Sequence, residues 1–393
     1  MALDKQTIDT LLTQAVSDGT TPGTAAMVAD RSGLLYEQTA GVATLGGDAP
    51  FTVDTPQYIA SMSKAITSTA CMMLVERGQL SLDTTAADVL PWAANPQVLE
   101  GFDENGEPRL RAARSSPTLK QLLTHTGGYS YEIWNADVLR YQEKTGTPGV
   151  LAAAQGTVET ALVADPGTQW EYGLNISVAG LMAAEVTGRD LGELLRELLF
   201  DPLGMDETCF ILSDDQKRRM ASLHARGPDG QLEVFPLIWE QDPQIKLGGE
   251  ALYGTPADYM RFLRMLVNDG LFEGRRLLSR DTMALMAGNQ MGDLNVRPMR
   301  TAMPPLSNDT DFYPGMPQKW GLSFLINTQD SPEGRPAGSL SWAGLCNSYY
   351  WIDRSNGITG ALFNQVMPFF DPACVGLFRA FETEVYRGLA AGR

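Results

Sequence analysis

The sequence predicts an α/β protein of the α+β type. An antiparallel sheet is flanked by N- and C-terminal helices, and a mostly helical domain is inserted between the two ends of the chain. Three observations predict this fold: a helix-and-hairpin pattern in the first 40 residues, helical periodicity through the middle, and a series of short strands after residue 320. With 393 residues, of which 44% are apolar, the chain can bury a substantial core.

The N-terminal part supplies the first elements of the sheet domain. Apolar spacing predicts a helix over residues 5–18 and a hairpin over residues 22–40. Over residues 60–77, apolar side chains occur on nearly every face of a helix, which ends at Gly78, a residue suited to a helix C-terminus. A helix that is apolar all round is buried, so its first residues lie at the edge of the core.

The pattern of apolar residues divides the chain into two predicted domains. Residues 1–80 and 260–393 are predicted to form the sheet domain and residues 81–259 the mostly helical domain, with the active site at their interface. A helix over residues 372–389 closes the chain. The later strands are predicted at residues 320–327, 339–343, 348–353 and 358–364.

Charge and hydropathy exclude several classes of partner. The net charge of −17 opposes binding to a phosphate backbone, which relies on clustered Lys and Arg, so neither nucleic acid nor anionic membrane is an expected partner. The N-terminus has no basic start followed by an apolar core, and no stretch reaches the roughly 18 apolar residues of a membrane span. These features predict a cytoplasmic protein.

Cysteine and histidine usage predicts an enzyme without metal or cofactor. Four cysteines are scattered without ligand spacing, which favours reduced structural thiols. The only histidines are His125 and His224, and no serine lies in a G-x-S-x-G turn. His125 precedes two glycines and is interpreted as structural, so a Ser-His-Asp hydrolase is disfavoured.

The segment Ser61-Met62-Ser63-Lys64 opens the buried helix and combines a nucleophile with a base. A lysine three residues after a serine lies on the same helix face, within hydrogen-bond reach of the hydroxyl. An amine takes a proton only when it is neutral, and both burial and the positive helix N-terminus favour that form. Ser61 is therefore the candidate acyl-transfer serine.

Further segments make this pattern specific. Trp170-Glu-Tyr-Gly-Leu-Asn175 follows a Pro-Gly turn, and Ser341-Trp-Ala-Gly-Leu345 ends a candidate strand. Together with Leu122-Leu-Thr-His-Thr-Gly-Gly128 and Ser61–Lys64, they resemble the serine β-lactamase and penicillin-binding-protein superfamily, and most closely its class C-like esterase branch, the family VIII carboxylesterases. The resemblance spans about residues 8 to 388, and it implies a serine β-lactamase-like fold.

The resemblance implies roles for three side chains and two backbone groups. Ser61 matches the acylated nucleophile and Lys64 its base, while Tyr172 matches the tyrosine that shares proton transfer with the lysine. By the same match, the N–H groups of Ser61 and Leu345 form the oxyanion hole.

Substrate-binding residues are expected from the same segments. Trp342, Ala343 and Gly344 match the W-x-G of esterase members, where β-lactamases carry K-T-G. The missing lysine removes a cation that pairs with a β-lactam carboxylate, so neutral esters are favoured. Asn175, one position later than the family's asparagine, and Tyr129, Tyr131 and Trp134 are further candidates for the substrate pocket.

The predicted function is a serine hydrolase that cleaves small-molecule carboxylic esters with short to medium acyl chains. The alternatives within the superfamily are a β-lactamase, an amidase or D-aminopeptidase, and an acyltransferase that passes the acyl group to an alcohol. A β-lactam-binding sensor or scaffold is the alternative that is not an enzyme. Retention of Ser61, Lys64 and Tyr172 argues against a scaffold without activity.

Overall fold

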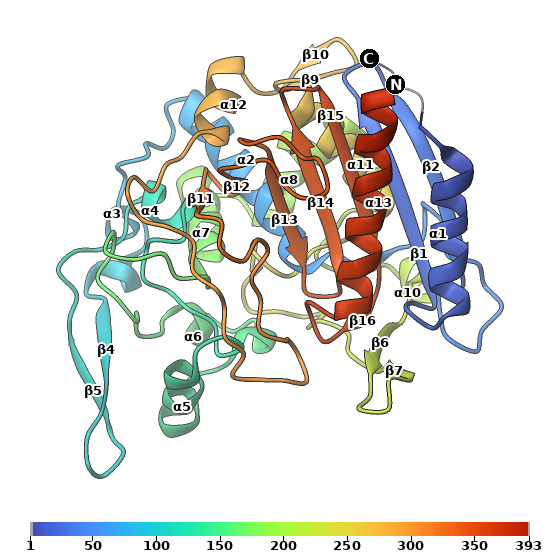
Figure 1. Cartoon of the computed structure of the whole chain (residues 1–393). Coiled ribbons are helices and arrows are strands. Elements are labelled where there is room, and N and C mark those ends of the chain that lie inside the picture. Colours follow the sequence, from blue (N-terminus) through green and yellow to red (C-terminus); the bar gives the residue numbers. More distant parts are fainter. Residues whose placement is uncertain (1–2, 392–393) are drawn as a thin grey trace.

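The largest sheet joins strands from the two ends of the chain (Figure 1). The computed structural model describes residues 3–391, and within them every neighbouring pair of this sheet is antiparallel. Within it Ala25, near the start of the chain, lies opposite Phe363, near its end, which confirms the predicted fold class. In spatial order the strands are β11 (Gln318–Trp320), β12 (Leu325–Asn327), β13 (Leu340–Gly344), β14 (Ser348–Asp353), β15 (Ile358–Phe363), β1 (Gly23–Asp30) and β2 (Leu34–Gly41).

The prediction of one strand over residues 320–327 is wrong. The chain instead makes a hairpin, in which β11 ends at Trp320 and β12 pairs back on it. Gly321 lies so close to a neighbouring loop that an added Cβ would be 2.2 Å from the carbonyl oxygen of Met286, and Ser323 has a φ of 91°. This close approach and the positive φ turn the chain where the side-chain pattern alone shows a continuous strand.

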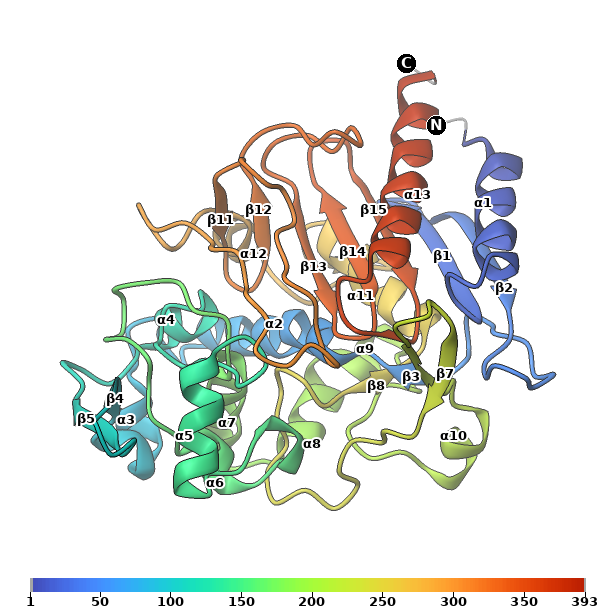
Figure 2. The same cartoon turned by 60° about the horizontal axis from the view of Figure 1, so that its bottom comes forward.

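Helices cover both faces of the sheet (Figure 2). The terminal helices α1 (Lys5–Ser17) and α13 (Pro372–Ala391) pack against each other on one face, and α11 (Pro256–Val267) covers the other. The alternation of side chains along β14 explains this arrangement. Trp351 packs on Phe378 of α13, whereas its neighbour Tyr350 packs on α11.

Residues 81–259 add no strand to the large sheet, although they form smaller sheets of their own. The helices of this region are α3 (Ala86–Val89), α4 (Leu119–Leu123), α5 (Ala136–Thr145), α6 (Gln155–Val158), α7 (Asn175–Thr187), α8 (Leu191–Leu195), α9 (Asp201–Leu203) and α10 (Asp214–Arg219), with the 3₁₀ turns η2 (Pro91–Ala94) and η3 (Val150–Ala152) and the π-helical turn η4 (Arg196–Phe200). α12 (Arg280–Ala287) follows α11. Among residues 3–391 no helix combines the length and the apolar character that crossing a membrane requires.

Several short strands tie distant segments together. β3 pairs with β8, and β16 adds a parallel strand to the β6–β7 hairpin, so the middle of the chain is hydrogen-bonded to both ends. The division into two domains stays a prediction. The short strands are β3 (Gln57–Tyr58), β8 (Tyr253–Gly254), β4 (Gln97–Phe102), β5 (Pro108–Ala112), β6 (Leu223–Arg226), β7 (Leu232–Phe235), β16 (Val366–Met367), β9 (Leu271–Phe272) and β10 (Arg275–Arg276).

The helix α2 (Ser63–Glu76) lies between the sheet and the inserted helices. It follows the turn η1 (Ala60–Met62) and packs against α7, and its side chains are buried without interruption over residues 63–74. The turn η1 contacts the end of β13. The start of α2 is therefore held between the edge of β13 and the helical region.

Candidate active site

Ser61 and Lys64 meet where η1 passes into α2. Lys64 is fully buried, and its Nζ lies 3.1 Å from the Oγ of Ser61. Ala60, directly before Ser61, has a φ of 48°, a left-handed conformation that is uncommon for a residue with a side chain. The Oγ of Ser63 donates to the carbonyl of Ala60 over 2.6 Å and holds this turn. The strained turn presents Ser61 to Lys64.

Lys64 is fixed by three further groups. Its Nζ donates to the carbonyl oxygen of Gly249 over 2.8 Å, and it lies 3.1 Å from the Oη of Tyr131 and 3.6 Å from Oε1 of Glu250. All of these groups are buried. Lys64 therefore has a defined orientation towards Ser61, with few rotamers open to it.

Glu250 is the centre of a buried hydrogen-bond network that sequence reasoning missed. It accepts from the hydroxyl of Tyr131 through Oε1 and from the hydroxyl of Ser177 through Oε2. The Oγ of Ser177 in turn accepts from the N–H of Gly249 over 2.9 Å. Burial, reinforced by the negative charge of Glu250, raises the pKa of Tyr131 well above its ordinary value, so this hydroxyl keeps its proton. The only sequence signal was a glutamate after two glycines in an apolar segment.

Tyr172 contacts Lys64 through the face of its ring. The Nζ of Lys64 lies 4.8 Å from the ring centroid, within the range of a cation–π contact. The Oη of Tyr172 accepts from Nε1 of Trp342 over 3.0 Å, and the hydroxyl that bonds to Lys64 is that of Tyr131. Apo geometry does not exclude a catalytic group, so proton transfer by Tyr172 stays a prediction.

A small, largely apolar cavity opens beside Ser61. Besides Ser61, its lining includes three residues predicted for the site, Tyr131, Trp134 and Leu345, and Glu250 contributes the one carboxylate among the lining residues. Such a lining suits an apolar substrate group with few polar anchors. The cavity is lined by Tyr58, Ala60, Ser61, Tyr131, Ile133, Trp134, Val150, Leu151, Leu237, Trp239, Glu250, Leu306 and Leu345.

The end of β13 brings the predicted oxyanion groups together. An added Cβ on Gly344 would lie 2.6 Å from the carbonyl oxygen of Ile59, so the strand passes directly against the turn that carries Ser61. Leu345 follows at once and lines the cavity. Trp342 bonds to Tyr172, while Ala343 lies opposite Tyr349 in β14. The role of the Ser61 and Leu345 N–H groups stays a prediction.

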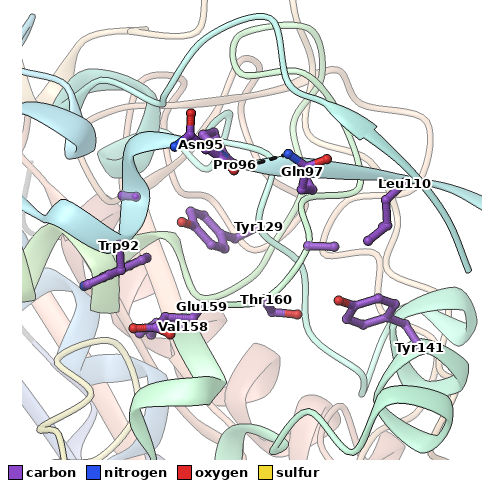
Figure 3. A pocket seen from close by; sticks show the side chains of 12 residues that line it. Trp92, Asn95, Pro96, Gln97, Leu110, Tyr129, Tyr141, Val158, Glu159 and Thr160 are labelled. Carbon is purple, nitrogen blue, oxygen red and sulfur yellow. Dashed lines mark hydrogen bonds between the residues drawn. The ribbon is translucent and has the colours of Figure 1, made fainter.

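The structure does not bring Tyr129 and Asn175 into the cavity at Ser61. The ring of Tyr129 lines a separate cavity next to the β4–β5 hairpin (Figure 3). Asn175 is fully buried, and its Nδ2 donates to the backbone carbonyls of Tyr129 and Glu171 over 3.0 and 3.2 Å. Because its amide is engaged with the backbone at the start of α7, Asn175 holds the Tyr172 segment in place.

His125 is a buried side chain beside Tyr172. Their ring centroids are 4.8 Å apart, and Nδ1 of His125 lies 3.3 Å from Nδ2 of Asn175. Burial, reinforced by the charge of Lys64, lowers the pKa of His125 well below its ordinary value, so the ring is neutral. Within residues 3–391, no group of three or more His, Cys, Asp or Glu side chains is placed to hold a metal ion.

Sequence comparison identifies the family. The family model described as Beta-lactamase matches residues 8–382. The chain belongs to the beta-lactamase family. Among curated members, it is 32% identical over 401 residues to the monacolin J acid methylbutanoyltransferase of Aspergillus terreus, covering 96% of this chain and 95% of the relative. It is 28% identical to the lovastatin esterase of Penicillium rubens, covering 98% of this chain and 99% of the relative.

Solved structures of beta-lactamase-like proteins agree with the fold. The unliganded simvastatin synthase of Aspergillus terreus superposes with a TM-score of 0.82 at 31% identity, over 97% of this chain and 98% of the other. EstCE1, a hydrolase with promiscuous acyltransferase activity, superposes with a TM-score of 0.76 at 20% identity, over 97% and 98% of the two chains. At that identity, EstCE1 supports the fold alone.

Proposed function

We propose that this protein is a serine acyl-transfer enzyme that cleaves carboxylic esters with apolar acyl groups, through an acyl-enzyme at Ser61. The observation that carries the proposal is the 3.1 Å contact between the Ser61 hydroxyl and the buried amine of Lys64, at the wall of an apolar cavity. A serine and a base within hydrogen-bond reach are the requirement for nucleophilic catalysis.

The proposed chemistry uses two similar half-reactions. Ser61 attacks the ester carbonyl and its proton passes to Lys64, while the N–H groups of Ser61 and Leu345 stabilise the oxyanion. The tetrahedral intermediate then expels the alkoxide, which takes a proton from Tyr172. The ammonium of Lys64 passes its proton to the tyrosine oxygen, so both groups are restored for the second half-reaction. An incoming water repeats these steps on the acyl-enzyme and releases the acid.

The charge of the cavity favours neutral substrates. No residue among those that line it carries a positive charge, and Glu250 places a carboxylate at its wall. Two negative charges in a poorly solvated cavity repel each other, so a β-lactam carboxylate is disfavoured there. The position that holds the K-T-G lysine in β-lactamases is occupied by Trp342, whose Nε1 is already engaged with Tyr172.

Transfer to an alcohol is the second candidate function. It is supported by the 32% identity to a methylbutanoyltransferase over nearly the whole length of both chains. The first half-reaction is the same in both cases, because the acyl-enzyme at Ser61 is the shared intermediate. What differs is whether water or an alcohol enters the apolar cavity to discharge it.

The test compares wild type with Ser61→Ala on p-nitrophenyl butyrate and nitrocefin, with product analysis in the presence of an added alcohol. We expect the wild type to turn over the ester faster than nitrocefin, and Ser61→Ala to lose at least about 10³-fold in kcat. Mass spectrometry should find the butyryl group on Ser61. A butyrate ester as the main product would favour transfer over hydrolysis.

Two results would contradict the proposal. Full ester turnover by Ser61→Ala would show that another nucleophile acts. Faster turnover of nitrocefin than of the butyrate ester would favour a β-lactamase. Ser63→Ala is less suitable as a control, because the Ser63 hydroxyl holds the turn before Ser61; Ser68→Ala, a buried substitution further along α2, is the matched control.

A further inference from the structure

Some neighbours of Lys64 can only accept hydrogen bonds. These neighbours determine in which direction each proton around the amine points. The carbonyl oxygen of Gly249 has no proton, so the amine donates to it. The Tyr131 hydroxyl has one proton, and this proton is directed to Glu250, because an ionised carboxylate can only accept. The oxygen of Tyr131 is then an acceptor towards Lys64.

This arrangement determines where the lone pair of a neutral Lys64 lies. A neutral amine has two N–H bonds and one lone pair. The carbonyl of Gly249 and the oxygen of Tyr131 take the two N–H groups, at 2.8 and 3.1 Å. The lone pair is left for the remaining neighbour, the Oγ of Ser61, from which it can accept a proton.

We propose that Glu250 is a positioning residue of this site: its carboxylate draws the Tyr131 proton away from Lys64 and thereby directs the lone pair of Lys64 at Ser61. The proposal rests on the acyl-enzyme function proposed above. Ser177 completes the arrangement by joining the carboxylate of Glu250 to the N–H of Gly249, which fixes the carbonyl that receives the other N–H group of Lys64.

The charge of Glu250 has a second effect during the reaction. When Ser61 attacks, its proton moves to Lys64, and the resulting ammonium lies 3.6 Å from Oε1 of Glu250. The carboxylate stabilises this ammonium by electrostatic attraction and takes no proton from it. The logic is that of the aspartate in a Ser-His-Asp triad, which orients the base and stabilises its protonated form. The titratable side chains around Lys64 and Glu250 are Tyr58, His125, Tyr131 and Tyr172.

The central experiment measures Glu250→Gln on p-nitrophenyl butyrate across pH. Glutamine keeps the shape of the side chain, but it removes the charge and introduces N–H donors next to Tyr131 and Ser177. We expect kcat to fall by about 10- to 100-fold with KM changed less than about 3-fold, because binding does not depend on the direction of the proton. The acid limb of kcat/KM should move to lower pH, since the ammonium form loses its neighbouring anion.

Two further variants separate positioning from a structural role. Glu250→Asp keeps the charge, so its acid limb should stay near that of the wild type even if kcat falls. Tyr131→Phe removes the bridging hydroxyl, and the double variant Tyr131→Phe/Glu250→Gln should lose less than the product of the single losses, because both act through one chain of hydrogen bonds. Should Glu250→Gln fail to fold, Tyr131→Phe takes its place: it removes the acceptor of one N–H group of Lys64, so kcat should fall by about 10-fold, and wild-type kcat in folded Tyr131→Phe would overturn the positioning role.

The control is Glu132→Gln, which changes another buried glutamate that accepts from the N–H of Val150 and makes no contact with Lys64. It should keep the wild-type rate and pH profile. The rate at which a fluorophosphonate labels Ser61 reports the nucleophile directly in each variant. Wild-type kcat and an unmoved acid limb in folded Glu250→Gln would overturn the positioning role, whereas activity in Ser61→Ala would overturn the proposed function instead.

Discussion

At the scale of single residues, two tyrosines contact Lys64 in different ways. Tyr131 supplies a hydroxyl that is tied to Glu250, and Tyr172 supplies a ring whose own hydroxyl is tied to Trp342. Tyr172 is the tyrosine that matches the family motif, whereas Tyr131 is the tyrosine whose hydroxyl lies within hydrogen-bond distance of Lys64. The two can have different roles, one in orienting the base and one in protonating the leaving group.

Tyr172→Phe tests the second of these roles. The ring stays beside Lys64, and only the hydroxyl is lost. If this hydroxyl protonates the leaving alkoxide, kcat/KM for p-nitrophenyl butyrate should fall by about 10²- to 10⁴-fold. Trp342→Phe removes the Nε1 donor to the same oxygen, together with part of the indole ring, and should cost much less. Activity of Tyr172→Phe within twofold of the wild type would mean that the hydroxyl serves only its bond to Trp342.

At the scale of elements, the close packing of β13 on η1 sets the distance between the two predicted oxyanion groups. Gly344→Ala places a methyl group against the backbone carbonyl of Ile59, so the strand or the turn must shift. We expect at least a tenfold loss of kcat with the far-ultraviolet circular dichroism unchanged. Gly376→Ala is the matched control, because an added Cβ on α13 meets nothing within 4 Å there and alanine favours the helix. Equal activities of the two variants would argue against this role of β13.

Local periodicity was enough to predict the helix that follows Ser61 and several strands of the large sheet. The first hairpin, the buried helix after Ser61 and the strand Ser348–Asp353 follow from side-chain spacing, because each has an uninterrupted pattern. The turn at Gly321 was missed, since a close approach to the backbone of Met286 leaves no trace in that pattern. Glu250 was missed for a related reason: its partners are brought to it by tertiary packing and not by spacing along the chain.

At the scale of the whole molecule, a buried carboxylate links the inserted region to the helix under the sheet. Asp258 in the first turn of α11 accepts from the N–H of Glu207 and the hydroxyl of Thr208, over 3.0 and 2.9 Å. Burial nevertheless raises the pKa of Asp258 from its ordinary 3.8 to about 6. The folded state therefore holds this proton more tightly than the unfolded chain does.

The raised pKa of Asp258 makes the stability of the protein depend on pH. The pKa of Asp258 is higher in the folded state. Its favourable contribution to the free energy of unfolding is therefore complete below pH 4 and is lost as the pH rises through about 6. Asp258→Asn cannot titrate, so its free energy of unfolding relative to the wild type should rise by up to about 3 kcal/mol between pH 4 and 7. Urea unfolding at both pH values measures this difference, with the exposed Asp281→Asn as control. A difference that does not change with pH would contradict the prediction.

The pairing of Ala25 with Phe363 also constrains how the protein is made. The first hairpin leaves the ribosome early, yet its partner strand is synthesised only several hundred residues later. At roughly 5–20 residues per second this delay is on the order of half a minute. During that time β1 can pair with β2 but lacks its other neighbour, β15, so the large sheet cannot be completed until the last strands emerge. The nucleophile can reach its final geometry only after that, because β13 is made in the same late segment.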